Sequence, residues 1–321
     1  MTKDFPDPAT DTDAFLRWLR EGAAQGRELA AARPSLRDVA QHLLAFEEEM
    51  VDALWDGRDT EKFRMHPLEP HRSAPGDIAG TPHLNPNGAL TNEVADGYVT
   101  ATRDHLGGIG SLAAVDGSRR SLLVLARTLL DVSTRAAYLL EPDIDDMERT
   151  RRAFNFLMDA IREEIADGDD STGLLERQAE LRAAAEADGF EFATKRNKAG
   201  NPVPDRNVLA PRVDPRKVRG EFLGDVEFAW RALSSVTHGQ EREVLRFALG
   251  LGPVSPGVHG DSYSLVWLAT SVESAAVAAA HAADYYGAQL DELLIQRVRE
   301  VLWAAAGMRD DAVRRRLGFD S

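Results

Sequence analysis

Arg231 and His238 stand seven residues apart near the end of one predicted helix. Seven residues bring two side chains back to nearly the same side of an α-helix, about 10 Å apart along its axis. A guanidinium binds phosphate through paired hydrogen bonds, and a histidine exchanges its proton near neutral pH. This pair suits metal-independent cleavage of RNA. Arg231 would stabilise the charge on the phosphorane, and His238 would act as acid or base on the 2′-hydroxyl or the leaving oxygen.

The helix that carries this pair is predicted from Asp214 to Gln240. Asp214 can cap the first amides, Pro215 suits the first turn, and no further proline occurs before Pro253. One face is apolar and is expected to face the core: Phe222, Val226, Ala229, Leu233 and Val236. The other face gathers the polar candidates for catalysis: Glu227, Arg231, Ser234, Ser235 and His238. The acid or one of the serines is placed to orient the imidazole.

A structural role for His238 is the alternative to catalysis. The residue precedes Gly239, where a glycine would end the helix, and a histidine in the last turn interacts favourably with the helix dipole. The sequence leaves both interpretations open.

A basic segment precedes this helix. Between Lys195 and Arg219 there are eight Lys or Arg residues and two Asp residues, a local net charge of 8 − 2 = +6 in a chain of −15. Its prolines favour an irregular loop. As substrate-binding residues that attract RNA phosphates we single out Lys195, Arg196, Lys198 and Arg206. The alternative is a solvated loop, or one that rests on an acidic face of the same protein.

A second polar stripe lies on the most hydrophobic predicted helix, which follows a capping serine at Ser118. Arg127 and Asp131 on this stripe are four residues apart and able to form an ion pair. Two interpretations remain open for the stripe. It is either a solvated face, or one wall of a substrate-binding cleft that faces the Arg231–His238 helix.

The remaining segments form the scaffold of an all-α helical bundle. Residues 1–57 are predicted as an N-terminal helical hairpin, with helices at 12–32 and from Leu36 to Gly57. Residues 58–87 form a proline-rich linker or packed loop, whose histidines are read as solvated rather than metal-binding: His66, His71 and His83. Residues 88–321 form the main bundle, which ends in a long helical element bent at Gly287.

The composition excludes several function classes. The absence of cysteine excludes disulfides, thiolate catalysis and Cys-ligated zinc, and it fits the cytoplasm. A net charge of −15 argues against general binding of nucleic acid or of an anionic membrane by the whole molecule. The N-terminus lacks the apolar stretch of a signal peptide. We expect no membrane association, no metal and no cofactor.

The segment RALSSVTH resembles the R-x4–6-H motif of HEPN-domain proteins, helical bundles that include many RNase toxins and defence nucleases. The resemblance covers about 25 residues, and Ala232 stands where many active members carry a polar residue. It implies a HEPN-like helical core and a homodimer in which two copies of the motif form one composite site.

The leading hypothesis is therefore a HEPN-like, metal-independent ribonuclease of a toxin or defence system. Its expected partners are RNA, an antitoxin or other protein, and further copies of itself. Two alternatives belong to other classes. One is a non-enzymatic helical interaction protein. The other is a small-molecule enzyme whose polar cleft is lined by Arg127, Asp131, Arg231 and His238.

Overall fold

The computed structural model describes residues 34–56, 84, 88–115, 119–168, 171–211, 233–234 and 260–305. Its elements in chain order are α2 (Leu36–Val51), the π-helical turn η1 (Asp52–Asp56), α4 (Ala89–Ala114), α5 (Arg119–Leu139), α6 (Asp146–Asp167), α7 (Ser171–Ala187), β1 (Phe192–Arg196), β2 (Pro202–Leu209), α11 (Gly260–Tyr286) and α12 (Glu292–Ala305). The described part is mostly helical, with one small two-stranded sheet, which confirms the predicted all-α bundle.

Some predicted features lie outside the described residues. They are the helix expected at 12–32, nearly all of the 58–87 segment with its three histidines, and most of the helix expected between Asp214 and Gln240. Of that last helix, residues 233 and 234 are described, and both are helical.

Capping side chains begin two of the helices, and α2 starts at Leu36 as predicted. Ser35 and Asp38 form a capping box at the start of α2: Ser35 Oγ accepts from the Asp38 amide at 3.2 Å, and Asp38 Oδ2 accepts from the Ser35 amide at 2.7 Å. Asp145 caps α6 by accepting from the amide of Glu148 at 2.7 Å. Each cap satisfies amides that would otherwise lack a partner at the helix end.

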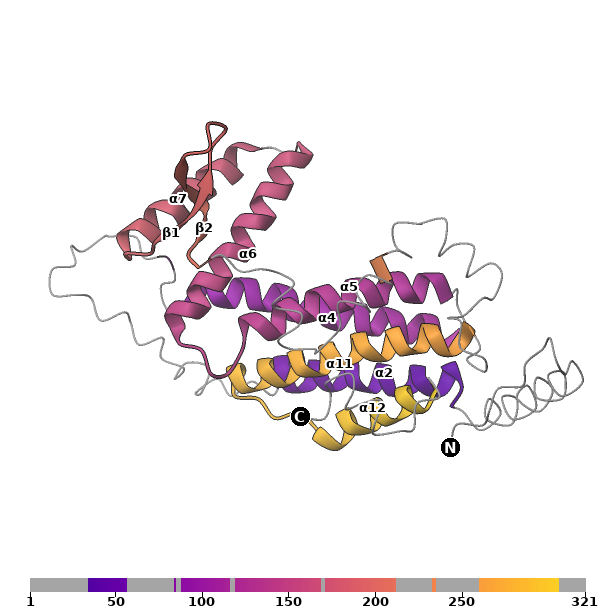
Figure 1. Ribbon diagram of the computed structural model, residues 1–321. Helices are drawn as coiled ribbons and strands as arrows, with labels where there is room; N and C mark the ends of the chain where they lie inside the picture. The colour runs from indigo at the N-terminus through magenta and orange to yellow at the C-terminus, as the bar shows by residue number, and fades with distance from the viewer. Residues whose placement is uncertain are drawn as a thin grey trace, which may run out of the picture.

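Glycines end two of the helices. Gly168 closes α6 with φ = 87°, and Gly287 follows α11 with φ = 66°, a conformation in which side chains with a Cβ are strained. The closing element predicted from residue 261 or 262 to 306 is consequently two helices, with α12 folded back along α11 (Figure 1).

Five helices lie side by side and form the bundle: α2, α4, α5, α11 and α12 (Figure 1). At its centre α5 packs along α11, where Ser133 Oγ donates to Ser274 Oγ at 2.7 Å. Because α12 runs antiparallel to α11, Trp303 near the end of α12 reaches back to Glu273 in the middle of α11. Helix α12 is therefore held against the middle of α11.

The core is continuous across these helices. Its largest fully buried side chains include Phe46, Leu106, Ile109, Leu123, Leu130 and Tyr286. Burying one such side chain contributes about 1.5–3 kcal/mol. Helices α2 and α4 approach closely at Gly110, where an added Cβ would lie 2.9 Å from Leu44 Cγ. A residue with a side chain at position 110 would therefore force the two helices to shift.

The helix α11 also explains a membrane-like signal. Among the described residues, one stretch, Leu265–Tyr286, is long and apolar enough to cross a membrane by length and composition. In the bundle, 72% of the apolar 18-residue window within this stretch is buried, as expected for a central helix.

Helices α6 and α7 leave the bundle and form an arm with a β-hairpin (Figure 1). Here the structure differs from the irregular loop expected from the prolines, because β1 pairs antiparallel with β2. The backbone bond from Asn197 to Asn201 closes the turn, so Pro202 and Pro204 fall at positions that donate no bond across the ladder. The prolines are therefore compatible with strand pairing.

A cluster of buried arginines joins the arm to the bundle. Arg151 Nη1 donates to the carbonyl of Pro211 at 2.5 Å, which holds the chain after β2 against α6. Arg152 Nη1 donates to Glu141 at 2.7 Å, and its guanidinium lies 3.6 Å from the ring centroid of Tyr138 at the end of α5. These contacts connect α5, α6 and the base of the hairpin.

Glu148 completes this cluster. It accepts from Arg151 Nε at 2.6 Å and from Arg152 Nε at 2.7 Å. Burial acts to raise the pKa of the Glu148 carboxyl, but the hydrogen bonds and charges of the two arginines outweigh it, and the pKa lies below its ordinary value.

Candidate functional site

The predicted catalytic helix meets the described structure at two residues. Leu233 has no exposed surface and belongs to the bundle core, whereas the neighbouring Ser234 is half-buried. At this one position the apolar stripe faces inward as expected. The other proposed catalytic residues lie outside the described residues: Glu227, Arg231, Ser235 and His238.

The polar stripe of α5 is more buried than a solvated face would be. Arg127 and Asp131 form the expected ion pair, with side chains 12% and 33% exposed. Thr134, three residues after Asp131, is 3% exposed and donates its hydroxyl to the carbonyl of Leu130 at 2.6 Å. Arg127 and Thr134 are therefore mostly covered, whereas Arg135 on the same helix is exposed.

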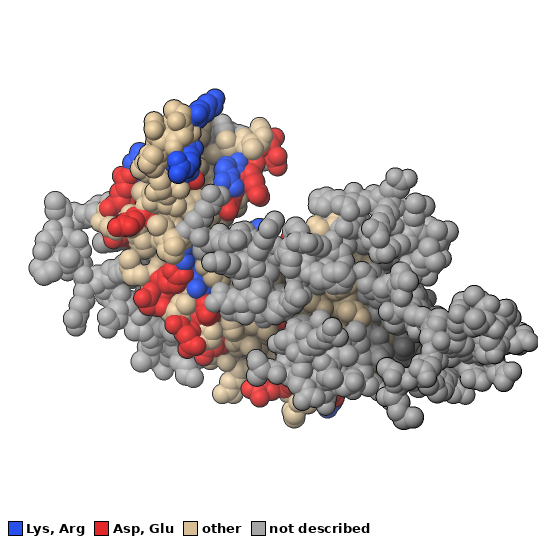
Figure 2. Space-filling view, viewed as in Figure 1, with Lys and Arg blue, Asp and Glu red and all other residues tan. Residues whose placement is uncertain are grey.

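The four cations assigned to RNA binding are brought together on the hairpin, at the top of the arm (Figure 2). Lys195 pairs with Asp205 at 3.0 Å, and Arg206 pairs with Glu186. Arg196 donates to the carbonyl of Gly200 at 2.9 Å, and Lys198 is exposed on the turn. Among the described residues, two of the four charges are thus offset by carboxylates, and two are not.

The hairpin is remote from residues 233 and 234, the described part of the predicted catalytic helix. In Figure 1 it lies at one end of the molecule, and the short helical turn of residues 233–234 lies beside the other end of the bundle. Within one copy, the structure does not bring the hairpin cations to Ser234.

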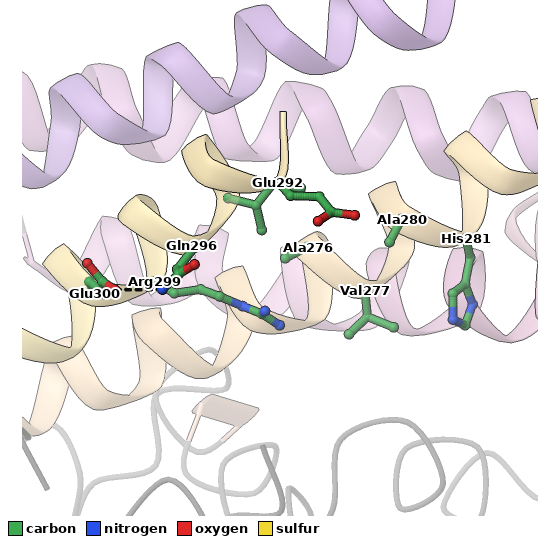
Figure 3. Close-up of a pocket in the computed structure, with 9 residues that line it drawn as sticks. Ala276, Val277, Ala280, His281, Glu292, Gln296, Arg299 and Glu300 are labelled. Atoms are coloured by element: carbon green, nitrogen blue, oxygen red, sulfur yellow. Dashed lines mark hydrogen bonds between the residues drawn. The ribbon is translucent and has the colours of Figure 1, made fainter. Parts of the chain in front are cut away.

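The described residues contain a groove of about 500 Å³ between α11 and α12 (Figure 3). Its apolar lining is formed mostly by small side chains: Ala276, Val277, Ala280 and Ile295. Its polar lining comes from both helices: His281, Glu292, Gln296, Arg299 and Glu300. The small side chains leave the volume of the groove open, and the polar side chains provide the groups that could bind a ligand.

A buried carboxylate holds the arginine of this groove. Glu273 is 2% exposed and accepts from Arg299 Nε at 2.5 Å and from Trp303 Nε1 at 2.9 Å, so each of its oxygens has a donor. The bond to Nε fixes one edge of the guanidinium, whose Nη groups extend along the groove toward Val277 (Figure 3). An arginine held in this way is oriented before a ligand arrives.

The histidine of the groove is also held. His281 Nδ1 lies 2.8 Å from the carbonyl oxygen of Ala137 on α5. Because a carbonyl oxygen only accepts, Nδ1 carries the proton, and in the neutral ring Nε2 is the basic nitrogen. His281 lies at the opposite end of the groove from the Arg299 guanidinium (Figure 3).

The groove is not expected from the sequence, which predicts for this region only a long helical element bent at Gly287. One usable signal was Glu273, a charge within an apolar run. Its partner Arg299 is 26 residues away, on a helix whose direction depends on the turn at Gly287.

No metal cluster is present in the part of the chain that the structure describes, since no three His, Cys, Asp or Glu side chains there are grouped to hold an ion. Comparisons with protein-family models, with curated proteins and with solved structures find no match. Any functional assignment therefore depends on the residues of this chain.

Proposed function

We propose that the chain is a HEPN-like helical protein that cleaves RNA without a metal ion, as part of a toxin or defence system. Arg231 binds the scissile phosphate, and His238 transfers the proton. The same residues would be needed in each copy of a homodimer.

The observation that carries this proposal is the burial of Leu233. A side chain with no exposed surface faces the core, which sets the rotation of the helix at that residue. On the helix expected from the sequence, Arg231 and His238 lie about 140–160° around the axis from Leu233. The burial of Leu233 therefore supports a motif that points away from the core, where RNA has access.

The chemistry needs two proton transfers. A base removes the proton of the 2′-hydroxyl, the 2′-oxygen attacks the phosphorus, and the 5′-oxygen leaves with a proton from an acid. The products are a 2′,3′-cyclic phosphate and a 5′-hydroxyl. One imidazole is base or acid at a given moment, so the second imidazole comes from the motif of the other copy, and the arginines stabilise the phosphorane.

The hairpin cations extend the substrate-binding surface. Because the hairpin is remote from residues 233–234 within one copy, it contacts a part of the RNA distant from the scissile bond, or RNA held by the other copy. Lys198 and Arg196 are the stronger candidates, since neither is offset by a carboxylate among the described residues.

The test compares wild type with Arg231→Ala and His238→Ala on total cellular RNA in EDTA, with circular dichroism to check folding. Cleavage by wild type alone, leaving cyclic phosphate ends, is expected. Absence of cleavage by wild type, or equal cleavage by folded variants, would remove the proposal.

A further inference from the structure

Opposite charges stand at the two ends of the groove between α11 and α12. Glu292 and Arg299 are seven residues apart on α12, which places them on the same face of the helix with about 10 Å between their backbones. Side chains on a helix lean toward its N-terminus, so the Arg299 guanidinium approaches the Glu292 end.

The guanidinium at the cationic end is held in place by a buried partner. Glu273 is 2% exposed and accepts from Arg299 Nε, so the guanidinium is held from inside the bundle and offers its Nη groups to the groove. Paired Nη donors match the two oxygens of a carboxylate or the oxygens of a phosphate.

The anionic end is formed by Glu292, and His281 lies further along the groove, on the side away from Arg299 (Figure 3). Among the described residues, Glu292 forms no ion pair with its side chain, whereas Glu300 on the same helix accepts from Gln296 Nε2 at 3.0 Å. A carboxylate in this position is suited to receive an ammonium group.

We propose that this groove binds a small zwitterion, with its anionic group on Arg299 and its ammonium group on Glu292. The volume of about 500 Å³ is within the usual range for small-molecule sites, and the small side chains of Ala276 and Ala280 leave room for an aliphatic chain between the charges. This site is separate from the proposed ribonuclease motif and does not depend on it.

Other charge patterns fit less well. A dication would place one ammonium group beside the Arg299 guanidinium, and a dianion would place one carboxylate beside Glu292. Both arrangements bring like charges together. A zwitterion satisfies both ends.

The experiment measures binding by isothermal titration calorimetry with the full chain. The probes are ω-amino carboxylates with three to six methylene groups between the charges. An alkanoate, an alkylamine and a diamine of matched length are the comparison ligands. We expect one or more amino carboxylates to bind at least tenfold more tightly than all three.

Three variants assign the site. Glu292→Gln removes the ammonium partner on an exposed side chain and is expected to weaken binding about tenfold, as is Arg299→Lys, which keeps the charge but loses the paired Nη donors. Glu164→Gln on α6 makes the same change as Glu292→Gln at an exposed position outside the groove and is expected to leave affinity unchanged.

The proposal is wrong if no amino carboxylate binds at millimolar concentration, or if the diamine binds as tightly as the best of them. It is also wrong if Glu292→Gln and Glu164→Gln have the same affinity. Because Glu292 is exposed, its substitution tests the site even if Arg299→Lys fails to fold.

Discussion

Glu273 and Arg299 form an ion pair across two helices, with the acid inside the bundle and the base at its surface. Glu273 Oε2 accepts from Arg299 Nε at 2.5 Å, and the two side chains are 2% and 33% exposed. A buried carboxylate is costly unless charged or polar donors satisfy it, and here Arg299 and Trp303 do so. The pair joins α11 to α12 and orients the guanidinium in the groove.

Glu273→Gln is expected to reduce the free energy of unfolding by about 1–3 kcal/mol, because the amide nitrogen replaces one acceptor and leaves Arg299 or Trp303 without one. Urea unfolding followed by circular dichroism measures the change. Glu292→Gln on the same groove is the control and should remain within about 0.5 kcal/mol of wild type. Equal stability of Glu273→Gln and wild type would contradict the role given to this carboxylate.

Gly110→Ala is expected to destabilise the bundle by about 1–3 kcal/mol, because the new methyl group would lie 2.9 Å from Leu44 Cγ and force α2 and α4 apart. Gly97→Ala on the same helix is the matched control, since an added Cβ there meets nothing within 4 Å. It should stabilise the protein by about 0.5–1 kcal/mol through helix propensity. Thermal or urea unfolding of both variants gives the comparison, and equal effects would refute the close approach.

Glu148→Gln is expected to lower the free energy of unfolding at pH 7, because a neutral amide replaces the charged carboxylate that accepts from Arg151 and Arg152. The pKa of Glu148 is lowered in the folded protein, so its stabilising effect is present above the unfolded-state pKa and is lost as the pH falls through the folded-state pKa. The gap between wild type and variant should close in acid.

Unfolding free energies from pH 7 down to pH 3 measure that gap. Asp159→Asn removes the carboxylate of an exposed pair with Arg162 and should change stability by less than about 1 kcal/mol at any of these pH values. A gap for Glu148→Gln that persists unchanged in acid would show that the carboxylate acts through packing rather than charge.

Lys198→Glu is expected to weaken RNA binding and to reduce the salt dependence of binding, because it removes a phosphate contact at the tip of the hairpin. Fluorescence anisotropy with labelled single-stranded RNA in the Arg231→Ala, His238→Ala background separates binding from cleavage. Arg297→Glu on α12 makes the same change of charge at an exposed position on another face. Similar losses from the two substitutions would indicate a general charge effect and not a binding arm.

Local signals in the sequence were sufficient for most helix boundaries. These signals act within a few residues of themselves, so they can be recognised from neighbouring residues. Examples are the capping box of Ser35 and Asp38, the cap at Asp145 and the glycine at Gly168. Apolar periodicity likewise identified the inward face at Leu233. The all-α class follows from these signals together.

The hairpin was missed because its prolines favour a loop locally. Whether Pro202 and Pro204 oppose strand pairing depends on the register with β1, which alternates bonded and non-bonded positions. The hairpin is also held by α6, where Asn155 exchanges hydrogen bonds with the backbone of Leu209 at 2.7 and 3.2 Å. Neither fact is local to the segment.

By itself the sequence determined the helical class and the ends of several helices, because capping and periodicity are properties of neighbouring residues. It also supplies the residue types on which the proposed cleavage of RNA depends. The tertiary structure decided which distant charges meet. Glu273 finds Arg299 only after the chain reverses at Gly287, and Arg151 finds the Pro211 carbonyl only after the hairpin folds back along α6. Such partners lie tens of residues apart, so packing rather than sequence spacing selects them.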